Sequence, residues 1–165
     1  MKKYMLLFVT ILLMSVSVPA QENWNSFKSE MGKFSIDFSG GVSVSERITK
    51  KATTYKTTFT ADSLNIMVSS SKHIKSLDGK DDLLNVSVDS FIKSIKGSFI
   101  SKKHIEYDGV KGIYAVMSLQ DGTVLVEYKV YNKGYYQYQL VAYAEKNLYN
   151  QKSADRYFDS FKIID

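Results

Sequence analysis

The strongest pattern in this sequence lies in residues 105–144, which read IEYDGVKGIYAVMSLQDGTVLVEYKVYNKGYYQYQLVAYA. Apolar and aromatic residues alternate with polar ones, which is typical of β-strands that bury one face. Three turn sequences interrupt the alternation: Asp108-Gly109, Asp121-Gly122 and Asn132-Lys133-Gly134. Such sequences favour the positive φ angles of tight hairpins. The stretch therefore predicts an antiparallel meander with strands at 105–107, 110–119, 123–131 and 135–144.

Further strands are predicted on the N-terminal side of this meander. Phe34, Ile36 and Phe38 alternate with polar residues and stop at Gly40-Gly41, which predicts an opening strand that faces a core. Residues 53–61 and 64–70 also have strand composition, and Asp62-Ser63 between them is a turn sequence. These two segments predict a hairpin.

Two helices are expected, one on each side of the meander. The first is predicted at 81–96, because apolar residues recur there at spacings of three and four, after Asp78, Asp81 and Asp82 and before Gly97. The three aspartates lack the glycine and glutamate spacing of an EF-hand, so a helix start is favoured over a calcium loop. The second helix is predicted at 151–160, followed by an extended tail at 162–164. This order predicts an α+β fold in which helices flank an antiparallel β-sheet.

Residues 1–20 predict a cleavable signal peptide. Lys2 and Lys3 form a positive start, residues 5–14 are apolar apart from Thr10, and Val18-Pro19-Ala20 supplies the small residues that precede a signal-peptidase cut. We expect cleavage after Ala20 and export to the periplasm or to the outside of the cell. A helix needs about 20 apolar residues to cross a bilayer, so no transmembrane segment is expected after cleavage.

Residues 21–165 predict a single domain, since no Pro-rich or Gly/Ser-rich linker and no internal repeat divides them. The chain has no cysteine, which excludes disulfides, cysteine nucleophiles, cysteine-ligated metal centres and a lipid anchor on cysteine. The formal net charge of +5 is scattered along the chain. Because no basic stripe is visible, we expect no nucleic-acid partner.

Four segments resemble the PsbP-like/Mog1 fold, known in bacteria from small exported PsbP-like and DcrB-like proteins. They are the strand Phe34–Phe38, the turn Tyr107–Gly112, the aromatic strand Tyr135–Leu140 and the closing segment Ala154–Phe161. The resemblance implies a PsbP/Mog1-like α/β/α sandwich. It carries no active site, and it implies a binding or assembly accessory rather than an enzyme.

The two histidines do not indicate a metal site. His73 and His104 both lie next to lysines, which disfavour a protonated ring, and neither begins a metal motif. A zinc site from His73, His104 and Asp108 would require the fold to bring them together, so exposed polar histidines are favoured. We expect no metal and no cofactor.

No catalytic residue is assigned from the serines. The chain has no Gly-x-Ser-x-Gly sequence, and Ser69-Ser70-Ser71 near His73 are expected to be solvent-facing strand residues. Asn85-Val86-Ser87 matches a glycosylation sequon, but it lies inside a predicted helix of a bacterial-type exported chain and is discounted.

Tyrosine is the most prominent residue type, with twelve in the chain. Tyr135, Gln137, Gln139 and Tyr143 share one face of their predicted strand, where they are candidates for binding a ligand or a partner. The alternative is that a helix covers this face and that the tyrosines are ordinary strand formers. Trp24 is expected to clamp the N-terminal segment.

The sequence therefore predicts a non-enzymatic exported accessory protein that binds an envelope or secreted protein partner. One alternative is a small-ligand or glycan-binding module that uses the tyrosine face. Another is a hydrolase with an unfamiliar site. A pocket of titratable groups would favour the hydrolase, a concave aromatic patch the ligand-binding module, and an exposed apolar patch the protein partner.

Overall fold

The computed structural model describes residues 24–61 and 63–164. The predicted signal peptide and its cleavage site after Ala20 lie outside these residues. The elements in chain order are β1 (Trp24–Ser29), β2 (Phe34–Ser39), β3 (Ser43–Ile48), β4 (Ala52–Ala61), β5 (Leu64–His73), α1 (Asp82–Ser94), β6 (Ser98–Tyr107), β7 (Val110–Leu119), a 3-10 turn (Gln120–Gly122), β8 (Val124–Lys133), β9 (Tyr136–Glu145), α2 (Gln151–Ser160) and β10 (Lys162–Ile163).

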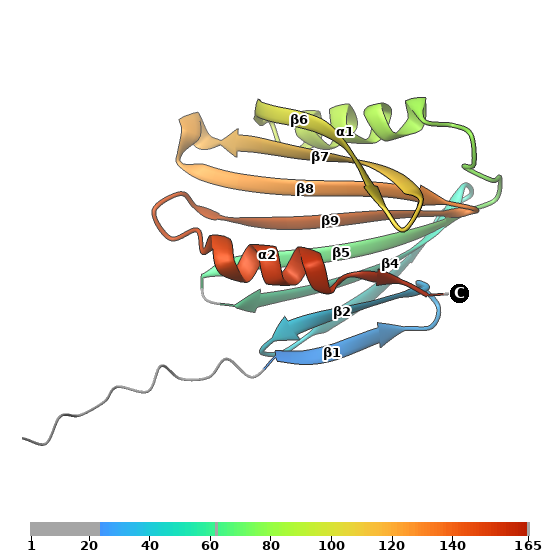
Figure 1. The fold of residues 1–165 in the computed structure, drawn as a ribbon, viewed down its shortest axis with the longest axis horizontal. Coiled ribbons are helices and arrows are strands. Elements are labelled where there is room, and N and C mark those ends of the chain that lie inside the picture. Colours follow the sequence, from blue (N-terminus) through green and yellow to red (C-terminus); the bar gives the residue numbers. More distant parts are fainter. Residues whose placement is uncertain (1–23, 62, 165) are drawn as a thin grey trace, which may run out of the picture.

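Seven of these strands form one antiparallel sheet in the order β3-β4-β5-β9-β8-β7-β6. The predicted meander supplies β6 to β9, and the predicted hairpin supplies β4 and β5. The central pairing of β5 with β9 joins the two groups through Val68 opposite Leu140. Figure 1 shows the long strands of this sheet running side by side, with the connecting turns at the two ends of the sheet.

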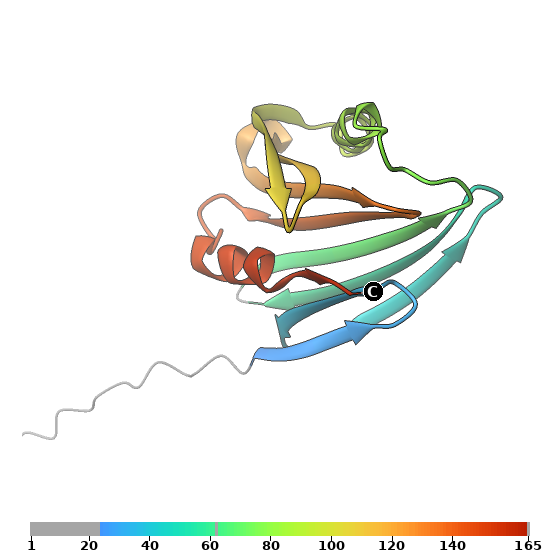
Figure 2. The same ribbon diagram turned by 45° about the vertical axis from the view of Figure 1, so that its right-hand side comes forward.

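The two helices lie on opposite faces of the seven-stranded sheet. Figure 2 shows α1 on one face, and α2 with the small sheet β1-β2-β10 on the other. The strands curve strongly in both ribbon views. This arrangement is the α+β sandwich that the sequence predicted. None of the helices among the described residues is long and apolar enough to span a membrane.

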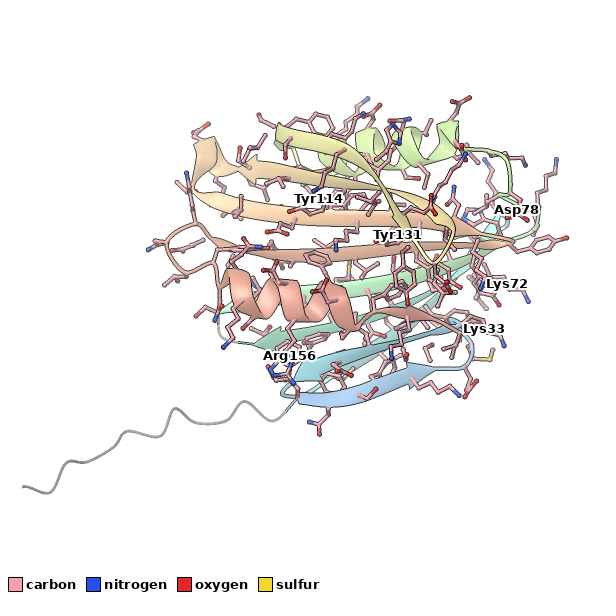
Figure 3. All side chains as sticks on the ribbon, in the orientation of Figure 1. Lys33, Lys72, Asp78, Tyr114, Tyr131 and Arg156 are labelled. Carbon is pink, nitrogen blue, oxygen red and sulfur yellow. The ribbon has the colours of Figure 1, made fainter. Side chains whose placement is uncertain are left out.

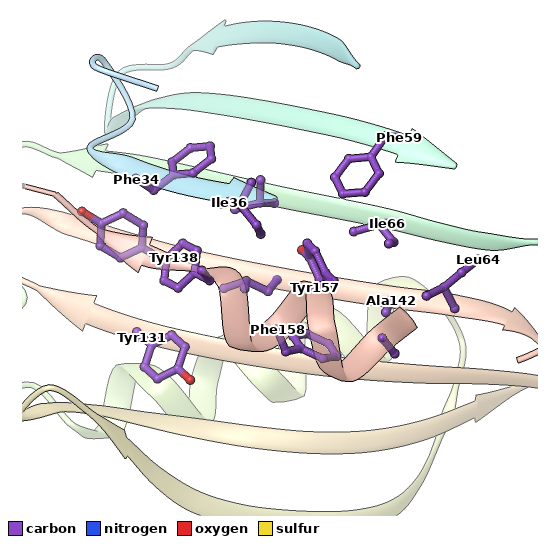
Figure 4. Close-up of a cluster of buried hydrophobic side chains, with 14 of the residues drawn as sticks. Phe34, Ile36, Phe59, Leu64, Ile66, Tyr131, Tyr138, Ala142, Tyr157 and Phe158 are labelled. Carbon is purple, nitrogen blue, oxygen red and sulfur yellow. The ribbon is translucent and has the colours of Figure 1, made fainter. Parts of the chain in front are cut away.

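The core on the α2 face is rich in aromatic side chains. Tyr157 and Phe158 from α2 pack against Phe34 and Ile36 from β2 and against Phe59 from β4, as Figure 4 shows. The rings of Phe59 and Tyr157 meet edge to face with centroids 5.9 Å apart, whereas those of Tyr131 and Phe161 are stacked. Such pairs stabilise a core by about 0.5–1.5 kcal/mol beyond area burial.

The core on the α1 face is mainly aliphatic. Leu84, Val88 and Ile92, spaced four residues apart on α1, pack on Ile113 of β7 and Val130 of β8. The Phe91 ring stacks on Tyr128 at 4.4 Å between centroids. The helical periodicity seen in the sequence therefore identifies the buried side of α1.

Local hydrogen bonds define the start of α2 and the end of α1. The Asn150 side chain accepts a hydrogen bond from the Ser153 amide at 3.2 Å, which caps α2. At the end of α1, the left-handed residue is Lys96, with φ 53°, and the Gly97 amide donates to the Ile92 carbonyl at 3.0 Å. A Cβ atom on Gly97 would lie 2.9 Å from the Leu119 side chain, so glycine is required there for close packing.

Three strands differ from the sequence prediction. β6 begins at Ser98 rather than at Ile105, and β1 and β3 were not predicted. Every side chain of β3 is exposed, so no buried face leaves an alternating pattern in its sequence. The first seven residues of β6 are also exposed, because β6 is an edge strand of the sheet, so they leave no alternating pattern either.

Candidate functional site

The predicted tyrosine face is not one exposed platform. Tyr135 is 52% exposed and Tyr143 is 41% exposed, but Gln137 between them is buried. The Gln137 amide donates to the Ser87 hydroxyl of α1 at 2.8 Å, and Gln139 donates to Gln137 at 2.8 Å. The platform interpretation is therefore wrong, because α1 needs this part of the sheet to bury its own apolar side. Eight residues of strand separate the two tyrosines by about 26 Å.

Tyr143 lines a hollow at the β4–β5–β9 region of the sheet. Its volume is about 550 Å³, and Thr58, Thr60 and Asn65 surround it with hydroxyl and amide groups. Lys56 adds an exposed cation, and Tyr143 lies opposite Asn65 in the sheet. This hollow combines the exposed ring of Tyr143 with hydrogen-bonding groups. Tyr135 belongs instead to the turn between β8 and β9.

The two histidines lie on separate strands. His73 ends β5 and His104 is exposed on β6, with β9, β8 and β7 between them in the sheet. The zinc set of His73, His104 and Asp108 is therefore not assembled. Burial lowers the pKa of His73, whose Nε2 atom has no hydrogen-bond partner among the described residues.

The serines near His73 have structural contacts. Ser70 is buried and donates to the Gly32 carbonyl at 2.6 Å, and Ser71 shares a 2.8 Å hydrogen bond with Thr54. Ser69 is also buried, so the expectation of solvent-facing serines is wrong for Ser69 and Ser70. Within the described ranges, none of these three serine side chains forms a hydrogen bond with His73.

Trp24 starts β1 and is half-buried. The Arg156 guanidinium of α2 lies 4.4 Å from the centre of its ring. This contact ties the first described strand to the last helix, as the predicted clamp requires.

A second group of titratable residues lines a groove between β6 and α2. We call it the Glu127 groove, and it comprises Lys103, Ile105, Glu106 and Tyr107 of β6, Tyr114 of β7, Glu127, Lys129 and Tyr131 of β8, and Asp155, Phe158 and Asp159 of α2. It consists of two adjoining hollows of about 240 and 430 Å³ that share Ile105, Lys129, Phe158 and Asp159. Figure 3 shows Tyr114 and Tyr131 along the sheet strands above α2.

Glu127 is the buried anchor of this groove. Its side chain carries a charge, yet it is only 4% exposed, on a strand in the interior of the sheet. One carboxylate oxygen accepts from the Tyr114 hydroxyl at 2.8 Å, and the other accepts from the Gln151 amide at 2.9 Å. Gln151 also donates to Asp155 at 2.9 Å. A buried carboxylate needs such donors, because burial without them costs several kcal/mol.

Two lysine side chains converge on the ring of Tyr114. The ammonium nitrogens of Lys103 and Lys129 lie 5.2 and 5.8 Å from the ring centre, and Lys129 is also 4.7 Å from the centre of Phe158. Burial lowers the pKa of Lys129, although nearby Asp159 and Glu127 oppose that change. The groove therefore holds both signs of charge on aromatic surfaces.

Two tyrosines of the groove, Tyr114 and Tyr131, remain neutral donors at physiological pH. Burial and the Glu127 carboxylate raise the pKa of Tyr114 well above its ordinary value, and burial raises the pKa of Tyr131 to about 12. The Tyr149 hydroxyl is buried near the same carboxylate, and its pKa is also raised. A general base works best with a pKa near the working pH, so these shifts suit binding rather than proton transfer.

Sequence reasoning missed this groove, although one signal was present. In β8, Glu127 and Lys129 alternate with Val126, Tyr128 and Val130, which face the α1 core. Charged residues on the face of a central strand opposite the α1 core indicate one of two things: that this face is exposed to solvent, or that it forms a polar site beneath a covering helix or loop. Only the position of α2 distinguishes the two.

Comparison with known proteins identifies the fold. No family model and no curated protein matches the chain. The solution structure of cyanobacterial PsbP (CyanoP) from Synechocystis sp. PCC 6803 is similar, with a TM-score of 0.61 and 10% identity over 92% of this chain and 98% of that one. A crystal structure from Bacteroides thetaiotaomicron VPI-5482 has a TM-score of 0.53 and 13% identity over 85% of this chain and 48% of that one. The PsbP-like resemblance predicted from the sequence is thereby confirmed at the level of the fold.

Proposed function

We propose that this chain is an exported, non-enzymatic accessory protein that binds a segment of a partner polypeptide in the Glu127 groove. The supporting observation is that cations, carboxylates and aromatic rings line one open groove between β6 and α2. A polypeptide segment offers the same three kinds of group, so this lining suits it better than it suits a purely apolar or purely anionic ligand. Export rests on the predicted signal peptide.

The walls of the groove provide the specificity in this proposal. Asp155 and Asp159 are exposed one helical turn apart on α2, and Lys103 is exposed opposite them on β6. Partner residues of complementary charge would bind between these walls, while the half-buried side chains of Ile105 and Tyr107 supply apolar contact.

A site-specific photo-crosslinking experiment in intact cells tests the proposal. A photoreactive residue at Lys103 or Asp159 should capture the same dominant protein, whereas the same residue at Lys93, exposed on α1, should not. The captured protein should no longer be crosslinked from position 103 when Asp159→Lys is added, because the charge of one wall is reversed. Equal capture from position 93, or capture that survives Asp159→Lys, would contradict the proposal.

The Tyr143 hollow supports a second candidate function, the binding of a glycan or small polar ligand. A tyrosine ring beside Thr58, Thr60 and Asn65 offers a stacking surface together with hydrogen-bonding groups. Screening glycans against the wild type and Tyr143→Ala tests this candidate, and Tyr135→Ala is the matched control on a distant exposed tyrosine. Binding that is equal in all three proteins would rule out the hollow as the site.

A further inference from the structure

Turns that are far apart in the sequence gather lysines at one end of the molecule. These are the turns between β1 and β2, β3 and β4, β5 and α1, and β8 and β9. The Ile74 amide donates to the Lys51 carbonyl at 3.4 Å, and the His73 amide donates to the Tyr135 carbonyl at 2.8 Å. The Tyr138 hydroxyl donates to the Lys33 carbonyl at 3.2 Å, which attaches the β1–β2 turn to the same end.

We call this surface the lysine end, and its members are Met31, Lys33, Ile48, Lys50, Lys51, Lys72, Ile74, Lys75 and Tyr135. Figure 3 shows Lys33, Lys72 and Asp78 there, with Arg156 toward the other end. Among the described residues, no ion pair involves Lys50, Lys51 or Lys75. The positive charge of this end is therefore available to a partner.

The nearby carboxylates already have partners. Glu30 pairs with Lys28 at 2.6 Å. Asp78 accepts from the Gly134 amide at 2.8 Å and from the Ser76 hydroxyl at 3.0 Å. Asp78 keeps its negative charge, because both of its donors are neutral, but the five lysines Lys33, Lys50, Lys51, Lys72 and Lys75 outnumber it, so the lysine end has a net positive charge.

Large apolar side chains project from the same turns. Ile48 is 74% exposed, Ile74 is 71% exposed and Met31 is 64% exposed, and Tyr135 stands beside them. An exposed isoleucine at a turn buries no apolar surface when the chain folds. Several exposed apolar side chains at one end of a molecule therefore indicate a surface that binds a membrane or another molecule. The positive charge of the surrounding lysines favours a binding partner with a negatively charged surface.

We propose that the lysine end docks the protein on an anionic lipid surface, with Ile48 and Ile74 entering the headgroup region while the lysines contact lipid phosphates. Lysines near a negatively charged bilayer each strengthen attachment several-fold, and apolar side chains add to it. An acidic protein surface would satisfy the lysines, but it would also have to supply a matching hollow for the exposed Ile48 and Ile74, whereas a headgroup region accepts them without one. This inference is independent of the Glu127 groove, which lies between β6 and α2.

Vesicle co-sedimentation tests the proposal with phosphatidylglycerol-containing vesicles and with pure phosphatidylcholine vesicles. The wild type should bind only the anionic vesicles, and binding should weaken with added salt. Lys50→Glu with Lys51→Glu should weaken binding at least about tenfold, since two cations become anions. Ile48→Ser with Ile74→Ser should also weaken it, by about tenfold.

The matched control changes the opposite end, where the loop after β9 carries exposed Lys146 and Leu148. Lys146→Glu with Leu148→Ser should leave binding unchanged, and all variants share the same N-terminal segment, so its contribution cancels. Absence of wild-type binding, equal losses in the control, or no effect of the isoleucine changes would each overturn the proposal. Self-association without vesicles that disappears in Ile48→Ser with Ile74→Ser would assign the surface to a second copy instead, and would also overturn it.

Discussion

The Tyr157 hydroxyl donates a 2.6 Å hydrogen bond to the Met67 carbonyl, joining the centre of α2 to the middle of β5. Tyr157 is fully buried, and Figure 4 shows its ring among the aromatic side chains of the α2-face core. The bond fixes α2 on the sheet at the point where it also forms one wall of the Glu127 groove. The position of α2 therefore connects the stability of the core to the shape of the candidate site.

Tyr157→Phe should reduce the free energy of unfolding by about 1–3 kcal/mol, because the Met67 carbonyl loses its buried donor. Tyr128→Phe is the matched control. The Tyr128 hydroxyl is buried without a hydrogen-bond partner among the described residues, so its removal should cost nothing or stabilise the protein. Urea unfolding followed by circular dichroism measures both. Equal losses in the two variants would contradict the prediction, because they would mean that the hydrogen bond to Met67 does not set the cost.

Gly112→Ala should destabilise the protein by about 1–3 kcal/mol or more, because a Cβ atom would lie 2.5 Å from the Tyr131 ring and 2.6 Å from the Val130 carbonyl. Gly41→Ala is the control, since its Cβ atom would meet nothing within 4 Å. That variant should change stability by less than about 0.5 kcal/mol. Thermal unfolding compares them, and a Gly112→Ala protein as stable as the wild type would show that β8 moves easily away from β7.

Acidification should weaken the protein through His73. Burial lowers the folded-state pKa of His73 below its ordinary value of 6.5, so the unfolded chain binds more protons in this range. The contribution is fully present above pH 6.5 and is lost as pH falls through the lower folded-state pKa. Urea midpoints measured from pH 7.5 to pH 5 should therefore fall less steeply in His73→Gln than in the wild type. The exposed His104→Gln should follow the wild type, and a flattened profile in that control would remove the assignment to His73.

Alkaline conditions should also weaken the protein, through its buried tyrosines. The pKa of Tyr131 is raised to about 12, and the pKa values of Tyr114, Tyr128 and Tyr157 are raised further. This stabilisation is complete below the unfolded value of 10 and is lost as pH rises through the folded values. Phenolate absorbance measured against pH should show these buried tyrosines ionising only as the fold is lost. Ionisation of all tyrosines in one early step would contradict the burial of this set.

Local patterns in the sequence were sufficient for several elements. Ala154, Tyr157 and Phe158 lie at helical spacing, and the helix from Gln151 to Ser160 has the predicted bounds. Asp108-Gly109 and Asn132-Lys133-Gly134 mark turns between strands that pair as a meander, with Gly109 and Gly134 at positive φ. These signals are legible because periodicity and turn chemistry depend on residues only a few positions apart.

Only the tertiary structure decided which surfaces are covered and which charges meet. The same alternation in β9 is compatible with an open face at Gln137, but in the structure α1 packs there and that residue is buried. Glu127 meets Gln151 because the chain returns α2 to the sheet, and the Lys33 carbonyl meets the Tyr138 hydroxyl because the β1–β2 turn packs on the same sheet. Such contacts join residues distant in sequence, and their free energies depend on burial that no short window of sequence records.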